Sequence, residues 1–380
     1  MKMKIIQLRT TLFCLLLTMM LLVCAYTRTL ADEGNEYDKY TLLFGDPHVH
    51  TCLSDGDESP DFAMIYAREV SHLDWCVITD HAEWMDPSAH DYYRTIPALY
   101  DDPGRFCVIF GYEYTDFQFN NHRNLYTLDT TLPILSSSDP DYSDINKVFE
   151  AIAGRDAIVV PHHPMTQSRE RWWARFDPDL EPLVEIYSKW GLSLYDGNPR
   201  PLHNSFKPNA VYDALSGQQL RLGFLGGSDT HLSRPGSNLL EVRTPLKYAK
   251  AGITGVWAEE FTNESIFKAM KARRTYALTG ERVELKFLVN GYVMGSEITS
   301  SEPPVLTFMI SSETRIATVK VNKITREDVI TIGTFSPHSN RYDGSYTDPD
   351  FAESAGYFVI VELTNNDLAI SSPVWVDFER

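Results

Sequence analysis

The chain has 380 residues, of which 43% are hydrophobic, 12% aromatic and 23% charged, a composition that excludes a largely disordered or low-complexity protein. Its formal net charge of −18 disfavours a nucleic-acid duplex as the main partner, because such binding depends on Lys and Arg side chains that neutralise phosphates. A small phosphorylated substrate stays compatible with this charge, since bound cations can reverse the local sign inside a pocket.

The first segment of the chain has the pattern of a secretory signal peptide. Three basic residues precede an apolar run over residues 11–23, and a short stretch with small residues leads to Ala31. We expect residues 1–31 to be removed and the mature protein to be exported to the periplasm or the medium. The apolar run is shorter than the ~20 residues of a membrane span, so we expect no span after cleavage. A lipid anchor at Cys24 is the less favoured alternative.

Between about residues 38 and 280, short apolar runs alternate with segments of helical spacing. The runs are rich in Val, Ile and aromatic residues and are bounded by Gly, Pro or Asp, which is typical of buried strands. They cover residues 40–44, 75–78, 106–110, 124–128, 157–160, 183–187 and 222–225. Strands that alternate with helices predict a parallel sheet with helices outside it, and seven strands suggest a closed or nearly closed barrel.

The pattern changes after about residue 283. Strand-like runs then follow one another, with turn residues between them and no convincing helix, over residues 285–289, 305–310, 317–321, 329–332 and 357–363. About a hundred residues of this kind predict a small β-sandwich. We therefore expect a β/α domain over residues 38–280 and a β-sandwich domain over residues 283–380.

Nearly every apolar run of the first domain is followed, on its carboxyl side, by His, Asp or Glu. The residues concerned are His48, His50, Asp80, His81, Glu113, His162, His163, Glu185, Asp229 and His231. In a barrel of parallel strands these ends converge on one face, where active sites lie. We expect distant parts of the chain to meet there in one pocket.

Two of these clusters have a spacing that suits metal binding. His48 and His50 are two residues apart, as are Asp229 and His231, and such residues point to the same side of an extended backbone. Mixed imidazole and carboxylate ligands suit zinc, manganese or iron better than calcium. One such motif alone is more often structural. However, seven of the eleven histidines fall in these clusters or in the Asn-His-Arg-Asn stretch at 121–124, which core packing does not explain.

The order of these motifs resembles that of the PHP (polymerase and histidinol phosphatase) superfamily. The resemblance covers about residues 41–235 and rests on His-Val-His-Thr at 48–51, Ser-Asp-Gly at 54–56, Thr-Asp-His at 79–81 and Ser-Asp-Thr-His at 228–231. Each motif alone is unspecific, but the set is specific. On softer features, the Asn-His-Arg-Asn and Pro-His-His-Pro stretches and the tail with Ser-Ser-Pro-Val-Trp-Val resemble the carbaryl-hydrolase-like branch of exported metallohydrolases.

The resemblance implies an α/β fold with a distorted seven-stranded β/α (TIM-like) barrel that holds two or three divalent metal ions, Zn, Mn or Fe. Carried over by motif, the ligands are His48, His50, Asp55, His81, Glu113, His122, His162, Asp229 and His231. Glu113 would bridge two ions. We expect His162 rather than His163 to be a ligand, because neighbours in an extended segment point apart, and His163 to face the substrate. Asp55 stands where some superfamily members have His.

This set of residues predicts hydrolysis of a phosphate mono- or diester by water that the metals activate. Arg123 is a candidate phosphate clamp, with a surface ion pair as the alternative. We expect Asp80 to orient a neighbouring histidine and Glu185 to be either an outer hydrogen-bond acceptor or a general base. Trp172, Trp173, Tyr187 and Trp190 follow strands and would either line the substrate cleft or pack the loops together.

Two other functions stay open at this point. The same metals and water would also hydrolyse a carbamate, ester or amide carbonyl, which the resemblance to the carbaryl-hydrolase-like branch keeps open. A metal-containing protein that binds a glycan or a partner without turnover is the second alternative. Nine plausible ligands argue against it, since binding alone needs no cluster that activates water.

Overall fold

The computed structural model describes residues 36–379 apart from 118, 120, 167–171, 204, 242–247 and 249. The expected signal peptide lies outside the described residues. The chain separates into two compact units, Met1–Asp38 and Lys39–Arg380. Of the first unit, the structure describes only the start of the short 3-10 helix η1 (Glu36–Lys39). The fold described below is that of the second unit.

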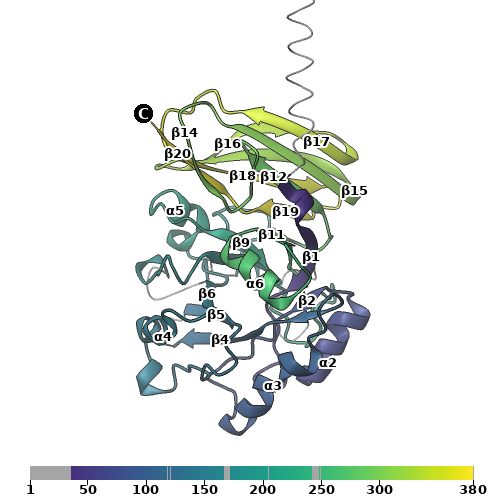
Figure 1. The fold of residues 1–380 in the computed structure, drawn as a ribbon, viewed down its shortest axis with the longest axis vertical. Helices are drawn as coiled ribbons and strands as arrows, with labels where there is room; N and C mark the ends of the chain where they lie inside the picture. The colour runs from purple at the N-terminus through teal and green to yellow at the C-terminus, as the bar shows by residue number, and fades with distance from the viewer. Residues whose placement is uncertain are drawn as a thin grey trace, which may run out of the picture. The chain divides into compact units, whose positions relative to one another are not determined.

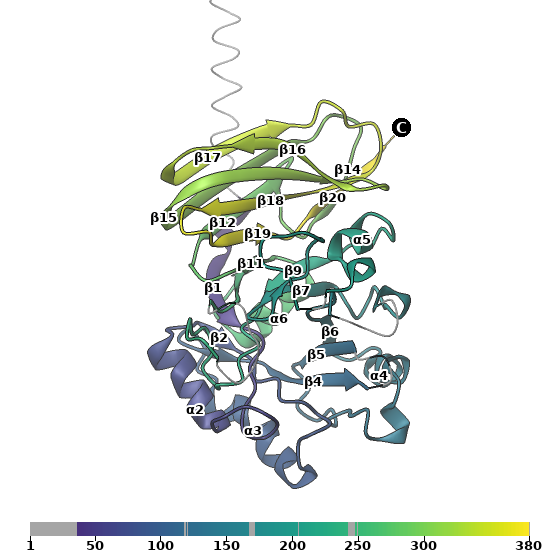
Figure 2. The same ribbon diagram turned by 180° about the vertical axis from the view of Figure 1, so that it is seen from behind.

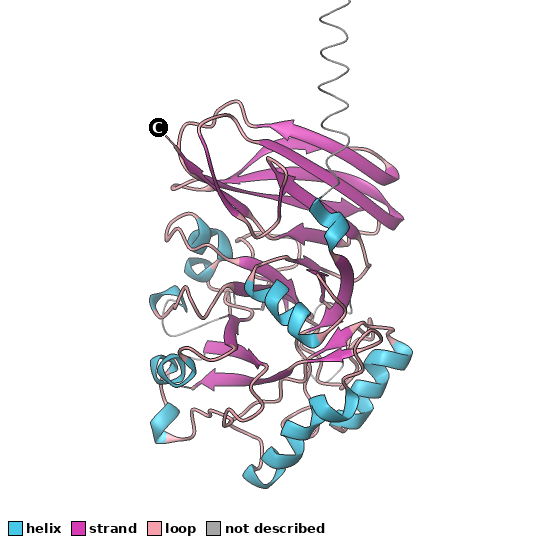
Figure 3. Cartoon of the chain, in the orientation of Figure 1, coloured by secondary structure: helices cyan, strands magenta, loops and turns pink. Residues whose placement is uncertain are grey.

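The main sheet of this unit has two parts. The larger part is built from the C-terminal strands (Figure 1). These strands are β12 (Glu284–Val289), β13 (Tyr292–Val293), β14 (Glu297–Ser300), β15 (Val305–Ile324), β16 (Val329–Phe335), β17 (Ser339–Thr347), β18 (Ala355–Leu363), β19 (Leu368–Ser371) and β20 (Val374–Phe378). No helix interrupts this run of strands in the part of the chain that the structure describes, as expected from the sequence (Figure 3).

The same sheet continues into the first part of the chain. β19 pairs with β11 (Thr275–Leu278), which pairs with β10 (Ile253–Ala258), and β10 pairs antiparallel with β1 (Thr41–Asp46). β2 (Trp75–Cys76) and β3 (Cys107–Val108) then extend the sheet in parallel. The hydrogen bonds therefore run without a break across the predicted boundary near residue 280, and the two-domain division itself stays a prediction.

Two smaller sheets complete the β structure. β4 (Phe110–Asp116), β5 (Asn121–Thr127) and β6 (Ala157–Pro161) form an antiparallel sheet, whereas β7 (Leu183–Ser188) pairs antiparallel with β8 (Gly191–Leu192) and parallel with β9 (Gly223–Gly226). The expectation of parallel strands throughout is therefore wrong for β4, β5 and β6. The connection from β4 to β5 is far shorter than the dozen residues that a parallel crossover needs, so these strands form a hairpin.

The sheets are joined at a few points but no closed barrel is detected among the described residues. Isolated parallel bridges pair Val49 with Thr230, His81 with Glu113, and His162 with Glu185. Each bridge lies near the carboxyl end of a strand. The seven-stranded barrel is thus not confirmed, but the fold is a sheet-rich mixture of α and β structure as predicted.

Helices lie beside the strands of the first part of the chain (Figures 1 and 2). They are α2 (Pro60–Ile65), which continues as the π-helix η2 (Tyr66–Val70), α3 (His90–Tyr100), α4 (Ile145–Ile152), α5 (Val211–Leu215) and α6 (Asn263–Lys271), with 3-10 turns η3 (Pro87–Ala89), η4 (Pro140–Tyr142), η5 (Trp172–Ala174) and η6 (Lys207–Asn209). Three of the helices begin at a capping side chain, since Ser59, Asp144 and Thr262 each accept a hydrogen bond from a backbone N–H of the first turn. None of the described helices has the length and hydrophobicity that a membrane crossing needs.

The apolar core also crosses the predicted domain boundary. Val184 and Phe224, on β7 and β9, belong to the same buried cluster as Phe358 and Ile370 of the C-terminal strands. The rings of Phe224 and Phe358 meet edge to face with their centroids 5.6 Å apart. The C-terminal strands therefore support the strands that carry the candidate site.

A buried ion pair in the C-terminal sheet gives a test of the fold. The Lys323 ammonium lies 2.7 Å from Asp348, which also accepts hydrogen bonds from the Tyr357 hydroxyl at 2.7 Å and the N–H of Asp350 at 3.1 Å. Burial raises the pKa of Asp348, but the hydrogen bonds from Lys323 and Tyr357 outweigh it and the pKa is lowered. A lowered carboxyl pKa stabilises the fold above the pKa of the unfolded chain, and this contribution is lost as the pH falls through the folded value.

We therefore expect Asp348→Asn to lower the free energy of unfolding by about 2–3 kcal/mol at pH 7. The difference from the unchanged protein should shrink below about pH 4, as measured by denaturant titration at several pH values. Asp343→Asn, which removes an exposed carboxylate from β17, is the control and should have little effect. A constant difference down to the acid limit would contradict the role of the ion pair.

Candidate metal centre

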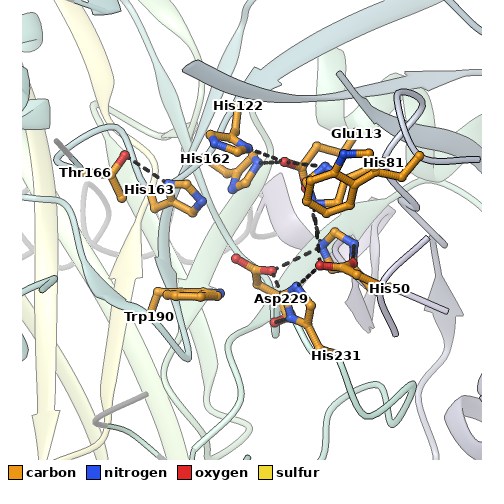
Figure 4. Close-up of a pocket in the computed structure, with 12 residues that line it drawn as sticks. His50, His81, Glu113, His122, His162, His163, Thr166, Trp190, Asp229 and His231 are labelled. Carbon is orange, nitrogen blue, oxygen red and sulfur yellow. Dashed lines mark hydrogen bonds and ion pairs between the residues drawn. The ribbon is translucent and has the colours of Figure 1, made fainter. Parts of the chain in front are cut away.

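The structure brings all nine predicted ligands together. Their side chains form five overlapping groups in which the ligand atoms lie within 4.8 Å of one another, and every predicted ligand belongs to at least one group. His163 joins His122 and His162 in one of these groups. The convergence expected at the carboxyl ends of the strands is therefore present (Figure 4).

Backbone contacts between strand ends explain how distant segments meet. The N–H of Asp229 donates to the carbonyl of His48 at 2.9 Å, and the N–H of His50 donates to the carbonyl of Thr230 at 3.0 Å. The segment after β1 and the segment after β9 thus lie side by side. Asp229 has a φ of 52°, a left-handed conformation that is uncommon for a residue with a side chain. This turn of the backbone is typical of functional sites.

Glu113 lies at the centre of the cluster and its two oxygens face different histidines. Oε2 is 3.3 Å from Nε2 of His48 and 3.4 Å from Nε2 of His50. Oε1 is 2.6 Å from Nδ1 of His122, 3.2 Å from Nε2 of His162 and 3.3 Å from Nδ1 of His81.

This division is the arrangement expected of a carboxylate that bridges two cations. Burial raises the pKa of Glu113, but the neighbouring His81 and His162 and the hydrogen bonds from His122 and His162 outweigh it and hold the pKa well below its usual range. Glu113 is therefore held as a carboxylate.

Asp229 and Asp55 lie on two sides of His50. Oδ1 of Asp229 is 3.2 Å from Nε2 of His50 and 3.5 Å from Nε2 of His48. Asp55 faces the other ring nitrogen of His50 at 3.3 Å and lies 3.2 Å from Nε2 of His231. His50 thus presents one nitrogen to each of two neighbouring ligand groups, and its ring stacks on that of His231 with centroids 4.3 Å apart.

The donor atoms of the cluster fit bound divalent cations. Nδ1 of His162 and Oδ2 of Asp229 are buried and have no hydrogen-bond partner among the described residues, and Nδ1 of His50 has only the ion-pair contact with Asp55. The Nε2 atoms of His48 and His50 face each other at 3.2 Å. Buried polar atoms are rarely left without a partner, and a cation held between imidazole and carboxylate groups would satisfy these atoms together.

Glu185 contacts the predicted ligand His48, as expected for the first of its two predicted roles, an outer hydrogen-bond acceptor. Its two oxygens lie 3.2 and 3.1 Å from Nδ1 of His48, and its side chain is fully buried. Burial raises the pKa of Glu185 to about 7 against the lowering effect of His48. Gly227 permits this approach, because a Cβ there would lie 2.6 Å from Glu185 and 2.7 Å from His48. A carboxylate in this position fixes the orientation of a metal-binding histidine.

Asp80 positions a turn and not a histidine, so the specific prediction for it is wrong. Its carboxylate accepts hydrogen bonds from the N–H of Thr51 at 2.7 Å, the hydroxyl of Thr51 at 2.5 Å and the hydroxyl of Ser54 at 2.6 Å. These bonds hold the turn that connects His50 to Asp55. Asp80 therefore supports two candidate ligands through the backbone.

The predicted role of Arg123 as a phosphate clamp is wrong for this structure. Its Nε donates to Glu181 at 2.8 Å and its Nη2 to the carbonyl of Arg175 at 2.8 Å, and the side chain is buried away from the cavity. His122 and Arg123 are adjacent on β5, so their side chains point to opposite faces of the sheet. Because His122 faces the cluster, Arg123 must face away from it.

His162 and His163 both line the cavity. His162 lies beside Glu113, as expected for the ligand of the pair, and Nδ1 of His163 lies 3.3 Å from the hydroxyl of Thr166. The φ of His163 is 34°, so the chain turns sharply after β6 and both rings reach the same cavity. The reasoning from an extended backbone therefore does not hold beyond His162.

A cavity of about 260 Å³ opens beside the cluster. It is lined by His50, Asp55, His81, Trp84, Glu113, His122, His162, His163, Thr166, Trp190, Asp229 and His231. Trp190 lines it as predicted, with its ring centroid 6.3 Å from that of His163 (Figure 4). Trp172, Trp173 and Tyr187 instead belong to a buried apolar cluster, so for these three the packing alternative holds.

Sequence reasoning missed Thr166, which contacts His163, and three further residues of the site. Trp84 is 51% exposed at the cavity, and its ring centroid lies 4.1 Å from that of His81. Lys189 and Glu241 form a buried ion pair at 2.9 Å. Glu241 also accepts the hydroxyl of Thr230 at 2.6 Å and the N–H of His231 at 3.0 Å. Trp84 lies three residues after His81 of the Asp-His motif, a position that was a usable signal, whereas no local pattern marks Glu241.

Comparison with known proteins gives distant relatives. Residues 230–307 match a protein family of unknown function, DUF3604. The chain is 24% identical over 359 residues to an uncharacterised protein of Chlamydia pneumoniae and 27% identical over 366 residues to one of Chlamydia trachomatis. Each alignment covers 88% of this chain and 57% of the relative, so the chain spans less than two thirds of the length of these relatives.

The chain is also similar to solved structures. One, from Bacteroides vulgatus, is described as a two-domain protein containing a predicted PHP-like metal-dependent phosphoesterase. It is 18% identical, with 90% of this chain and 96% of that chain covered and a TM-score of 0.45. At this level of similarity the function must be argued from the site itself.

The bridging position of Glu113 gives a test of the metal centre. Glu113→Gln keeps the shape of the side chain but removes the charge between the two sets of histidines. We expect the purified variant to lose at least one equivalent of bound metal, measured by elemental analysis after saturation with zinc or manganese. Glu83→Gln, in a half-buried glutamate outside the ligand groups, is the matched control and should keep its metal. Full metal content in Glu113→Gln would rule out the bridging role.

Glu241 gives a separate test of positioning. Glu241→Gln should weaken metal binding by about 10–100-fold, because contacts that orient ligands have effects of this size. Calorimetric titration of the metal-free protein measures the affinity, and the unfolding midpoint shows whether the fold is kept. Glu297→Gln, which alters an ion pair of β14, is the control. An unchanged metal affinity would show that Glu241 serves only the fold.

Proposed function

We propose that this chain is an exported metal-dependent phosphoesterase that hydrolyses phosphate mono- or diesters with two or three divalent ions of Zn, Mn or Fe. The observation that carries the proposal is the buried Glu113 carboxylate, whose two oxygens each face their own set of histidines. A cluster of this kind exceeds what is needed to hold one structural ion, since such sites usually have four ligands.

Bound divalent ions would lower the pKa of water and offset the negative charge that develops on phosphate oxygens during hydrolysis. The residues that would hold them are the nine ligands predicted from the sequence. Glu185 orients His48 through Nδ1, and Asp80 holds the turn between His50 and Asp55. These contacts prepare the site before substrate binds, which reduces the reorganisation needed during the reaction.

The residues that line the cavity suggest how a substrate would be held there. Thr166 contacts Nδ1 of His163, so the other ring nitrogen is the atom available to a substrate oxygen. Burial lowers the pKa of His163 to about 4. His163 would therefore be neutral at pH 7 and would hydrogen-bond to substrate without adding charge. Trp84 and Trp190 would contact the apolar part of the substrate and exclude water there.

Two parts of the proposal rest on the sequence. The pattern of residues 1–31 supports export, with a small-molecule substrate met outside the cytoplasm. The order of the motifs supports membership of the PHP superfamily, and softer features favour its carbaryl-hydrolase-like branch. The isolated bridges at His81, His162 and Val49 support a strongly distorted relative of the seven-stranded barrel, because they link neighbouring sheets where a barrel would have continuous pairing.

One observation favours a second candidate, a hydrolase of carbamates, esters or amides. Arg123 is turned away from the cavity and paired with Glu181, so the guanidinium that the sequence offered for binding phosphate is not at the site. The same activated water would attack a carbonyl carbon. The two candidates share the metal centre and differ in substrate.

Hydrolysis of p-nitrophenyl phosphate, bis-p-nitrophenyl phosphate and p-nitrophenyl acetate distinguishes them. Mature protein is assayed as purified, after chelation and after zinc, manganese or iron is restored. We expect chelator-sensitive cleavage of a phosphate substrate and a loss of at least about 100-fold in Asp229→Ala, a larger effect than that of an outer contact. Asp343→Asn serves as the control. Metal-dependent cleavage of the acetate alone would instead favour the second candidate.

A further inference from the structure

A second cavity, of about 250 Å³, lies apart from the metal centre. It is enclosed between one face of the C-terminal strands and the segment that runs from β8 to α5. Its lining shares no residue with the metal cavity. The hydrolysis proposed above gives this space no role.

The floor of the cavity is one face of the main sheet. The residues of β15, β18 and β19 that line the cavity are alternate residues of each strand, and alternate residues lie on the same face of a strand. The register places Lys320 beside Ile360, and Ile360 beside Ile370. Glu362 follows Ile360 on the same face, and Leu368 lies next to Ile370 in the same way. The floor is therefore apolar at its centre and carries one ammonium and one carboxylate group at its edge.

The roof is aromatic and is only partly covered. Tyr195 and Tyr212 stack with their ring centroids 5.1 Å apart and an interplanar angle of 30°, and both are half-buried. Leu192 and Leu194 are buried beside them. Thr331, at the rim, is exposed, so the cavity opens to solvent there. A ligand could therefore enter without the sheet opening.

The size of the cavity limits the ligand to about one ring. A cavity of about 150 Å³ holds a benzene molecule, and pockets for drug-sized ligands begin at about 300 Å³. The polar groups define its chemistry. Lys320 offers hydrogen-bond donors, Glu362 offers acceptors, and the Thr331 hydroxyl donates to Asn322 at 2.8 Å. Because the charged groups have opposite sign, they favour a neutral ligand with hydroxyl groups over a highly charged one.

We propose that this cavity is an accessory binding site for one sugar residue, a ring with apolar faces and a hydroxylated edge. The apolar faces would contact Ile360 and the tyrosines, and the hydroxyl groups would bind Lys320 and Glu362. The site is connected to the metal centre through a short stretch of chain, since Trp190 lines the metal cavity and Leu192 lines this one. A bound sugar chain would thus be held on the same body as the metal centre.

Ligand-observed NMR and calorimetry with glucose, galactose, mannose and N-acetylglucosamine, and with phenylalanine and tyrosine as comparison ligands, test the proposal on chelated mature protein. Chelation removes binding that depends on metal. We expect saturable binding of at least one sugar, abolished in Thr331→Trp, which fills the rim. Binding should be at least tenfold weaker in Glu362→Gln. Ile330→Trp is the matched control, because Ile330 is exposed on the opposite face of the same strand.

The outcomes that overturn the proposal are distinct from failure of the hydrolase proposal, which no step of this experiment uses. Equal binding in Thr331→Trp and the unchanged protein would place the sugar elsewhere. Saturable binding of phenylalanine or tyrosine and of none of the sugars would assign the cavity to a zwitterionic aromatic ligand. The absence of saturable binding by every sugar, with all variants folded by circular dichroism, would also exclude the site.

Discussion

The candidate centre depends on keeping one buried carboxylate, Glu113, charged among five imidazole rings. An isolated buried charge is very costly, so the carboxylate is tolerable only with positive charge on both sides. Asp55, Asp229 and Glu185 add further negative charge within the same cluster. The positive charge that offsets these carboxylates comes either from protons on the histidines or from metal ions. Asp229 and Glu185 raise the pKa of His48 against the effect of burial, and Asp55 raises that of His231 to about 9. Protons and metals therefore compete for one set of atoms.

The backbone around the cluster adopts conformations that let these charged side chains lie close together. Asp229 and His163 adopt positive φ values, and Gly227 leaves room for the contact between Glu185 and His48. These features are costly for folding and do nothing for the apolar core. They are compensated by packing elsewhere, including the cluster that joins β7 and β9 to the C-terminal strands. The C-terminal sheet thus contributes to the site although none of its residues lines the metal cavity.

Much of the candidate site could be predicted because its residues follow apolar runs, and strand ends carry functional groups whichever way the strands are paired. The pairing itself was harder to predict, because periodicity does not reveal the partner of a strand. The short connection before Asn121 was a usable signal for the β4–β5 hairpin. Arg123 was misassigned although its neighbour His122 was a candidate ligand, because adjacent residues of a strand point to opposite faces and only one of the two can reach the cluster. The role of Asp80 depends on a turn at Thr51 and Ser54, and that of Glu241 on a contact between loops. Such contacts have no local sequence pattern.

The continuous sheet has a consequence for how the protein folds. β1 pairs with β10, some two hundred residues later, and β11 obtains its outer neighbour only from β19, almost at the end of the chain. The hydroxyl of Ser372 also receives the N–H of Phe224, on the strand that precedes Asp229. Pairings over such sequence distances close large loops and form slowly. The outer edge of β11 therefore stays unpaired until β19 has been made, and in this interval it is exposed to aggregation.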